Sequence, residues 1–184
     1  MPTPAWAVPA IISELNLHHP DYTFVDLGSG MGRVVLIAAQ YPFRRVVGVE
    51  LSSELNRIAG ENLSRLGNAL RAEAVDLIRL DAREYEFPPG NLAVYMFNPF
   101  QAQVMQVVLE NLRRRFNSQD AELYIIYFNP VQAPLLDASP YLEKIRTTRL
   151  YSVYRSRPSQ RPVNLTLHGN RRNYVSVRES PQQR

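Results

Sequence analysis

Short apolar runs alternate with helical segments along most of the chain. Five runs rich in valine, isoleucine and tyrosine have the length of buried strands: Thr23–Leu27, Arg45–Leu51, Val75–Leu80, Leu92–Phe97 and Leu123–Phe128. Between them, the spacing of apolar residues predicts helices over Gly32–Gln40, Ser52–Leu66 and Gln101–Phe116. Strands that alternate with helices join through right-handed crossovers into a parallel sheet with both faces covered. The pattern therefore predicts a doubly wound, Rossmann-like α/β fold.

The pattern loosens after Pro130. A short helix is expected at Ala133–Ala138, and the β-rich stretches Leu142–Tyr154 and Asn173–Val177 are expected to close the sheet. Arg157–Arg172 holds two prolines and a glycine without a clear period, which is typical of a long loop. No internal repeat is evident. We expect an N-terminal cap segment at 1–22, one domain at 23–178 and a flexible tail at 179–184.

Composition narrows the chemistry. A chain of 184 residues with 45% hydrophobic residues can bury one sizeable core, so one domain is expected. It has no cysteine, which excludes disulfides, thiolate-bound metals and a thiol nucleophile, and we predict no metal site. No apolar run approaches the roughly 18 residues of a membrane span, and the first residues do not resemble a secretory signal. The expected location is cytoplasmic.

Arginine carries the positive charge. The net charge is +4, and Lys144 is the only lysine. Seven arginines crowd the last part of the chain: Arg155, Arg157, Arg161, Arg171, Arg172, Arg178 and Arg184. Such a run is usually a solvated surface or tail. It is also a candidate nucleic-acid-binding region, for which affinity would fall steeply with salt.

Three glycines stand where the first strand turns into the first helix, in the segment Val25-Asp26-Leu27-Gly28-Ser29-Gly30-Met31-Gly32-Arg33. Glycine lets the backbone approach a ligand closely, and a helix N-terminus favours polar or charged ligand groups. Three glycines at alternate positions are costly for a plain turn. The segment therefore predicts a nucleotide-like ligand.

The glycine spacing distinguishes two kinds of ligand. A dinucleotide loop reads G-x-G-x-x-G, but its third glycine would fall at Arg33, whose bulk opposes close packing of helix and strand. Glu50, about 20 residues further on, could accept from ribose hydroxyls in either case. Asp26 lies just ahead of the glycines, where a carboxylate can order the loop near a cationic ligand. This arrangement favours a sulfonium amino acid over a pyrophosphate.

FVDLGSGMGR resembles motif I of the seven-stranded, class I S-adenosylmethionine-dependent methyltransferases, and GVEL with Glu50 resembles their ribose-binding acidic loop. FVDLGSG and GVEL also resemble the non-SET histone-lysine methyltransferases and their bacterial relatives, and Pro2-Thr3-Pro4 is similar to a group of protein-lysine methyltransferases. The resemblance implies a mostly parallel seven-stranded sheet with an antiparallel C-terminal hairpin. It also implies S-adenosyl-L-methionine as the cofactor.

The resemblance implies roles for particular residues. The expected cofactor-binding residues are Asp26, Gly28, Ser29, Gly30, Gly32, Arg33, Glu50, Leu51, Asp81, Ala82 and Asn98, with Leu80-Asp81-Ala82 at the adenine. Asn98 and Phe100, after the fourth strand, are the expected catalytic residues. They match the Asn/Asp, proline and aromatic positions of the amino-methylating branch. That branch has two prolines where this chain has only Pro99, which argues against a slot for a flipped base.

The function predicted from these features is transfer of a methyl group to an amine nitrogen by in-line displacement. A protein lysine or another macromolecule is the favoured acceptor. Positioning is the main demand of such a reaction, and no general base is evident. His18 and His19 precede the first strand, where solvated or capping roles are expected. The alternatives are a non-catalytic module that binds RNA or protein and, less favoured, an NAD-dependent oxidoreductase.

Overall fold

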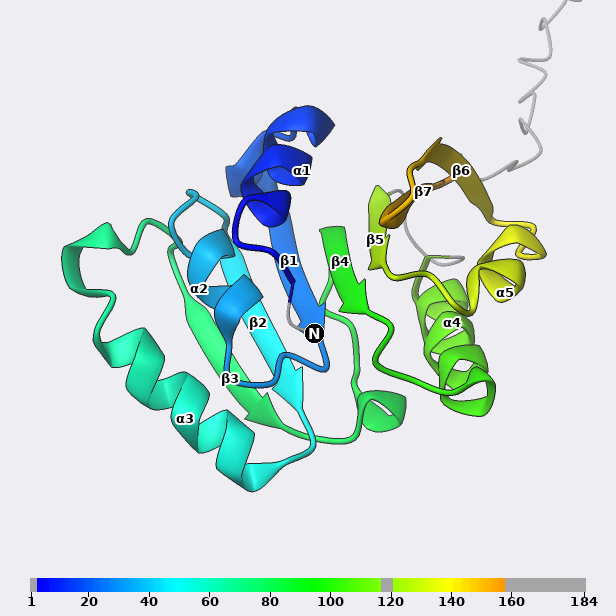
Figure 1. Ribbon diagram of the computed structural model, residues 1–184. Helices are drawn as coiled ribbons and strands as arrows, with labels where there is room; N and C mark the ends of the chain where they lie inside the picture. Colours follow the sequence, from blue (N-terminus) through cyan, green and yellow to red (C-terminus); the bar gives the residue numbers. More distant parts are fainter. Residues whose placement is uncertain (1–2, 117–120, 158–184) are drawn as a thin grey trace, which may run out of the picture.

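A single seven-stranded sheet organises the protein. The computed structural model describes residues 3–116 and 121–157. The strands are β1 Tyr22–Leu27, β2 Arg45–Glu50, β3 Val75–Arg79, β4 Asn91–Phe97, β5 Leu123–Phe128, β6 Leu142–Thr147 and β7 Tyr151–Ser156. Their order is β3-β2-β1-β4-β5-β7-β6, with the first five parallel and β7 antiparallel to both β5 and β6. The expected Rossmann-like sheet with an antiparallel hairpin is confirmed (Figure 1).

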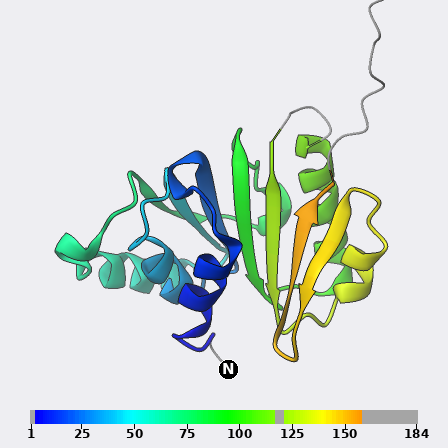
Figure 2. The same cartoon turned by 90° about the horizontal axis from the view of Figure 1, so that it is seen from above.

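Helices cover both faces of the sheet. One face carries α1 Ala7–Leu15, α2 Arg33–Ala38 and α3 Ser53–Ser64, and the other carries α4 Ala102–Phe116 and α5 Ala133–Asp137 (Figure 2). Short 3-10 turns lie at η1 His19–Asp21, η2 Gly67–Ala69 and η3 Ala82–Glu84. The two helical layers enclose separate apolar cores against opposite faces of the sheet. None of the described helices is both long and apolar enough to cross a membrane.

The central strands are buried on both faces, which explains their continuous apolar runs. Every residue of β1 and β5 is buried. Neighbouring residues point to opposite faces, so Val25 and Leu27 enter the core beneath α4, while Phe24 enters the core beneath α1 and α2. Asp26 shares the face of Phe24. A carboxyl group is therefore placed inside an otherwise apolar layer.

Helix α1 is the element that the sequence pattern missed. It lies within the expected cap segment 1–22 and buries Ala7, Val8, Ile11 and Ile12. Pro9 obscures it in the sequence, yet proline is tolerated in the first turn because the amides there have no intrahelical partner. Ser52 caps α3 as expected, since its hydroxyl accepts from the Leu55 amide at 3.3 Å.

The C-terminal hairpin forms entirely within residues 142–156. Thr148 closes its turn, since the hydroxyl of that residue accepts from the amides of Leu150 and Tyr151. The sheet has its seven strands without Asn173–Val177, which lies outside the described residues. So do the end of the domain at 178, the tail at 179–184 and all but the first residue of the expected loop Arg157–Arg172.

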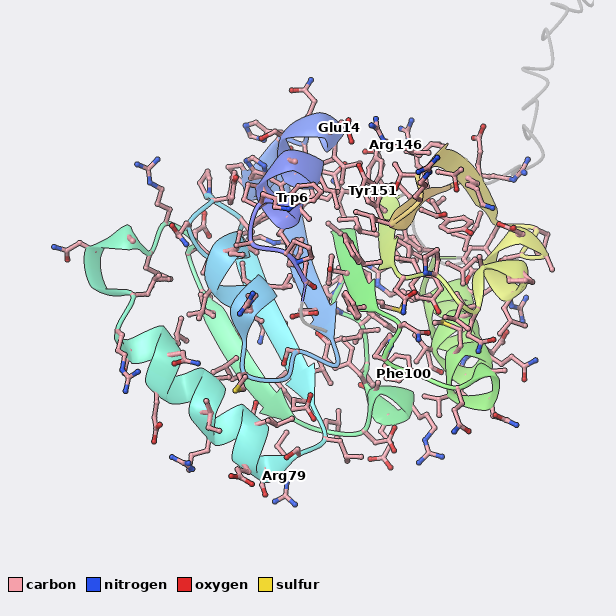
Figure 3. All side chains as sticks on the ribbon, in the orientation of Figure 1. Trp6, Glu14, Arg79, Phe100, Arg146 and Tyr151 are labelled. Carbon is pink, nitrogen blue, oxygen red and sulfur yellow. The ribbon has the colours of Figure 1, made fainter. Side chains whose placement is uncertain are left out.

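Helix α1 is anchored at both ends. Ahead of it, the Thr3 hydroxyl shares a buried 2.7 Å hydrogen bond with the Tyr95 hydroxyl of β4. At its far end, Glu14 lies 2.6 Å from the Arg146 guanidinium and accepts from the Tyr151 hydroxyl at 3.1 Å. Figure 3 shows Glu14, Arg146 and Tyr151 together where α1 meets the hairpin. The N-terminal segment thus links the centre of the sheet to its antiparallel end.

The buried anchor can be tested by substitution. Thr3→Val keeps the side-chain shape but leaves the Tyr95 hydroxyl without a partner, so we expect a loss of about 1–2 kcal/mol in the free energy of unfolding. Tyr95→Phe removes the other hydroxyl of this hydrogen bond. If the pair acts as described, the loss in the double variant is clearly smaller than the sum of the two single losses in denaturant unfolding. Additive losses would show that the two hydroxyls are energetically independent.

Candidate functional site

The glycine loop folds back over the end of β2. Gly28, Gly30 and Gly32 have φ angles of 77°, 54° and 82°, a region that other residues rarely adopt. The amides of Gly28 and Ser29 donate to the Val49 carbonyl at 2.9 and 3.1 Å. Gly32 then begins α2, and a Cβ there would lie 3.0 Å from the Cβ of Ala59 in α3. Both the backbone conformation and the close helix packing require glycine.

Glu50 ties the glycine loop to the loop after β2. One carboxylate oxygen accepts from the Gly30 amide and the other from the Ser52 amide, both at 2.9 Å. The side chain is half-buried at the carboxyl edge of the sheet. Glu50 therefore fixes the shape of the loop as well as presenting negative charge beside it.

Asp26 is a buried carboxyl with no partner among the described residues. Only 3% of the residue is exposed, and it makes no hydrogen bond or ion pair with any residue that the structure describes. Burial raises the pKa of the Asp26 carboxyl to about 8, and the nearby Glu50 carboxylate adds to the increase. The ligand-free protein thus carries an acid below the glycine loop whose charge would be stabilised by an arriving cation.

The neighbouring part of this edge begins at Asn98, which follows β4. Its φ is 36°, and its amide oxygen accepts from the Tyr127 hydroxyl at 3.3 Å. That hydroxyl in turn accepts from the Gln132 amide at 3.0 Å. Phe100 is half-buried and packs against the core beneath α4. In Figure 3, Arg79 and Phe100 mark opposite ends of this edge, near the ends of β3 and β4.

The glycine loop and the turn at Asn98 touch each other. A Cβ on Gly28 would lie 2.7 Å from the Cβ of Pro99, which is closer than two such atoms can approach. The glycine loop, the buried acid, Glu50 and the Asn98 turn therefore form one continuous site at the carboxyl ends of β1, β2 and β4. In open α/β sheets, ligands bind at this edge.

Comparison with known proteins identifies the fold. Residues 5–88, which hold the glycine loop and Glu50, match the family model of Histone methylation protein DOT1. A putative methyltransferase, yhhF, from Escherichia coli is 18% identical over 86% of this chain and 88% of its own, with a TM-score of 0.65. The chain has the fold of a class I S-adenosylmethionine-dependent methyltransferase.

Two further proteins share this methyltransferase fold. The magnesium protoporphyrin IX methyltransferase of Synechocystis, solved with bound S-adenosylmethionine, is 15% identical over 83% of this chain and 78% of its own, with a TM-score of 0.58. The ribosomal protein L11 methylase of Lactobacillus delbrueckii is 17% identical over 81% of this chain and 76% of its own, with a TM-score of 0.57. No curated protein sequence matches the chain significantly.

The residues expected at the adenine lie directly after β2 and β3. Asp81 caps η3, since its carboxylate accepts from the Arg83 amide at 2.9 Å and pairs with the Arg83 guanidinium at 2.6 Å. This contact holds the pKa of the Asp81 carboxyl below its usual value. Leu51 is exposed and Ala82 is buried. Asp81 is thus a helix-capping residue in this structure, and its role in binding adenine stays a prediction.

Arg33 and Gly48 change one step of the sequence interpretation. The Arg33 side chain is exposed and donates to the Thr3 carbonyl at 3.2 Å, so its bulk does not oppose the packing of α2 on the sheet. The close approach comes from Gly48 of β2, where a Cβ would lie 2.8 Å from Val35 and 3.0 Å from the Ser29 hydroxyl. Glycine inside a strand often marks such an approach, which is the signal that could have identified this residue.

Proposed function

We propose that the protein is an S-adenosylmethionine-dependent methyltransferase that modifies an amine nitrogen of a macromolecule. The observation that carries the proposal is Asp26, a fully buried carboxyl with no partner among the described residues, directly below a glycine loop. An unpaired buried charge is costly, so this group favours a cationic ligand over the anionic pyrophosphate of a dinucleotide. A sulfonium amino acid supplies that cation.

The residues at the edge fit the parts of this cofactor. Asp26 would pair with the ammonium group, and the backbone of residues 28–32 would contact the amino-acid portion. A Cβ on Gly30 meets nothing within 4 Å, so the loop leaves open space at its centre. Glu50 would accept from the ribose hydroxyls, and Leu51, Asp81 and Ala82 would surround the adenine. Ser29 and Arg33 complete the expected set.

The chain's own contribution to catalysis is placement. When bound, the cofactor supplies an electrophilic methyl group on a sulfonium. Asn98 would accept a hydrogen bond from the target nitrogen and hold its lone pair in line with that methyl group. The Tyr127 hydroxyl donates to the side-chain oxygen of Asn98 at 3.3 Å and so holds the Asn98 side chain in place. The apolar surroundings at Pro99 and Phe100 favour the neutral, nucleophilic form of an amine.

A protein amine is the acceptor that we favour. The matched family description concerns histone methylation, and one similar structure is a ribosomal protein methylase. Another is described as an RNA methyltransferase. Transfer of labelled methyl groups from S-adenosylmethionine to an extract of the source organism, digested beforehand with protease or with ribonuclease, separates these classes. Loss of incorporation after protease treatment alone supports a protein acceptor, and cofactor binding without any incorporation would favour a non-catalytic module.

Glu50→Gln is expected to weaken S-adenosylmethionine binding by about 10- to 100-fold. The substitution removes the charged acceptor for the ribose hydroxyls and weakens the contacts with the Gly30 and Ser52 amides. Isothermal titration measures the change. Glu61→Gln, at an exposed ion pair with Arg57 on α3, is the matched control and should bind as the wild type does. Equal affinities for the two variants would exclude Glu50 from the cofactor site.

A further inference from the structure

A short repeat occurs at the ends of two neighbouring strands. Residues 97–102 read Phe-Asn-Pro-Phe-Gln-Ala, and residues 128–133 read Phe-Asn-Pro-Val-Gln-Ala. Six residues are too few to form an internal repeat of the fold, but their positions in the sheet correspond. Phe97 and Phe128 are partners in the parallel pairing of β4 with β5.

The two copies have similar backbone conformations. Asn98 and Asn129 both adopt left-handed conformations, with φ angles of 36° and 47°. Each is followed by a proline, and a helix begins at the alanine of each copy, α4 at Ala102 and α5 at Ala133. The Asn98 amide donates to the Phe128 carbonyl, so the first turn rests on the strand that leads into the second. The chain therefore presents two equivalent turns next to each other at the active edge.

Asparagine tolerates the left-handed conformation, so the second turn permits Asn129 without requiring its side chain for another purpose. A left-handed conformation is met with the least strain by glycine, so the asparagine side chain adds only its amide. Asn129 is exposed, and its side-chain amide makes no hydrogen bond with the described residues. Its counterpart Asn98 is engaged by Tyr127, whose hydroxyl also accepts from Gln132 of the second turn. The two turns are thus fixed relative to each other, while the side-chain amide of Asn129 is available to a ligand.

The surroundings of Asn129 resemble a surface for a peptide. Two exposed apolar residues are joined to Asn129 by backbone hydrogen bonds: Val131, which is 58% exposed, and Leu150, whose carbonyl accepts from the Asn129 backbone amide at 2.7 Å. Neither copy of the repeat contains a charged residue. Phosphate recognition depends on clusters of cationic side chains, whereas exposed Arg149, next to Leu150, is a single cation, so this surface suits a peptide better than a nucleic-acid backbone. An amide between apolar side chains suits a peptide group and its neighbouring side chains.

We propose that Asn129 is a specificity-determining residue that binds a backbone peptide group of a protein acceptor, while the neighbouring Asn98 receives the target nitrogen. The inference rests on the proposed methyltransferase function. A side-chain amide carries an NH2 donor group beside a carbonyl acceptor, so it can pair with the carbonyl and the N–H of a peptide group. Val131 and Leu150 contact the side chains that flank the modified residue. The duplicated turn therefore provides one position for the reacting group and one for the chain that carries it.

Asn129→Gly tests this role because it keeps the left-handed turn and removes only the amide. With the protein fraction of the extract as acceptor and labelled S-adenosylmethionine as donor, we expect the half-saturating acceptor concentration to rise about 10-fold or more. The maximal rate should stay within about 3-fold of the wild-type rate, and the cofactor Kd should not change. Asn16→Gly is the matched control, since Asn16 has a φ of 48° at the end of α1.

The outcomes separate this inference from the function on which it rests. An Asn129→Gly variant that saturates like the wild type and like Asn16→Gly would overturn the inference and reduce Asn129 to a turn residue. Incorporation that is abolished by ribonuclease alone would overturn the peptide acceptor. Failure of the wild type to bind S-adenosylmethionine would instead reject the proposed function itself. Asn98→Gly provides the contrast, because loss of the residue beside the target nitrogen should lower the maximal rate.

Discussion

Asp26→Asn is expected to stabilise the ligand-free protein at pH 7.5 and to weaken S-adenosylmethionine binding by at least about 100-fold. The asparagine removes an ionisable group that burial and Glu50 disfavour in its charged form. It also removes the charge that would pair with the cofactor ammonium, which is a loss of about 3 kcal/mol or more for a buried ion pair. Higher stability of the free protein together with weaker cofactor binding would show that Asp26 serves ligand binding at the expense of stability.

The pH dependence of stability follows from the direction of this shift. The pKa of Asp26 is about 8 in the folded protein, compared with 3.8 for an unperturbed aspartate. Below pH 4 the carboxyl is protonated in both states and has no effect. Between pH 4 and pH 8 only the unfolded chain releases the proton, so the wild type loses stability as the pH rises through this window.

Denaturant unfolding at pH 4.5, 6 and 7.5 measures this difference. The stability gain of Asp26→Asn over the wild type should be small at pH 4.5 and reach at least about 2 kcal/mol at pH 7.5. Asp21→Asn, at an exposed carboxylate beside His18, is the control and should not show the same rise. Parallel profiles for the wild type and Asp26→Asn would show that Asp26 is already ionised in the free protein.

Gly28→Ala is expected to have the second large effect. The residue has a φ of 77°, and a Cβ would lie 2.7 Å from the Cβ of Pro99, so the glycine loop and the turn at Asn98 cannot both keep their positions. We expect a loss of about 2–4 kcal/mol in the free energy of unfolding, because backbone strain and overpacking add. Methyl transfer should fall even at saturating cofactor, since Pro99 follows Asn98 directly.

Gly30→Ala provides the matched comparison within the same loop. Gly30 also has a positive φ, of 54°, but an added Cβ meets nothing within 4 Å. Its substitution should cost only the strain of the left-handed conformation, about 1–2 kcal/mol. Thermal or denaturant unfolding of the two variants separates strain from collision. Equal losses of stability in the two variants would show that the close approach of Gly28 to Pro99 does not affect the free energy of unfolding.

The sequence was sufficient for the architecture because its signals are local. Each buried strand is a continuous apolar run, and the glycine loop lies within one segment, so β1 to β5 and the loop were predicted close to their observed bounds. Helix α1 was missed because Pro9 hides a short helix whose stability comes from burying Ile11 and Ile12. The hairpin of β6 and β7 appeared as one stretch because its turn at Thr148 contains neither glycine nor proline.

The parts of the site that escaped prediction depend on residues far apart in sequence. Tyr127 contacts Asn98 only because β4 and β5 are neighbours, and Gly48 contacts Val35 only because α2 packs across β2. The hydrogen bond between Thr3 and Tyr95 joins residues that are 92 positions apart in the sequence. Strand order and helix placement determine these contacts. They therefore cannot be predicted from local patterns in a single sequence.

Calorimetric titration of the wild-type protein with S-adenosylmethionine, S-adenosylhomocysteine and NAD tests the central claim most directly. The site described here predicts saturable binding of the two adenosyl ligands and none of NAD. It also predicts release of a proton on S-adenosylmethionine binding near pH 7, because the arriving ammonium ionises Asp26. No binding of either adenosyl ligand, or tighter binding of NAD, would contradict the assignment of the glycine loop and of the methyltransferase function.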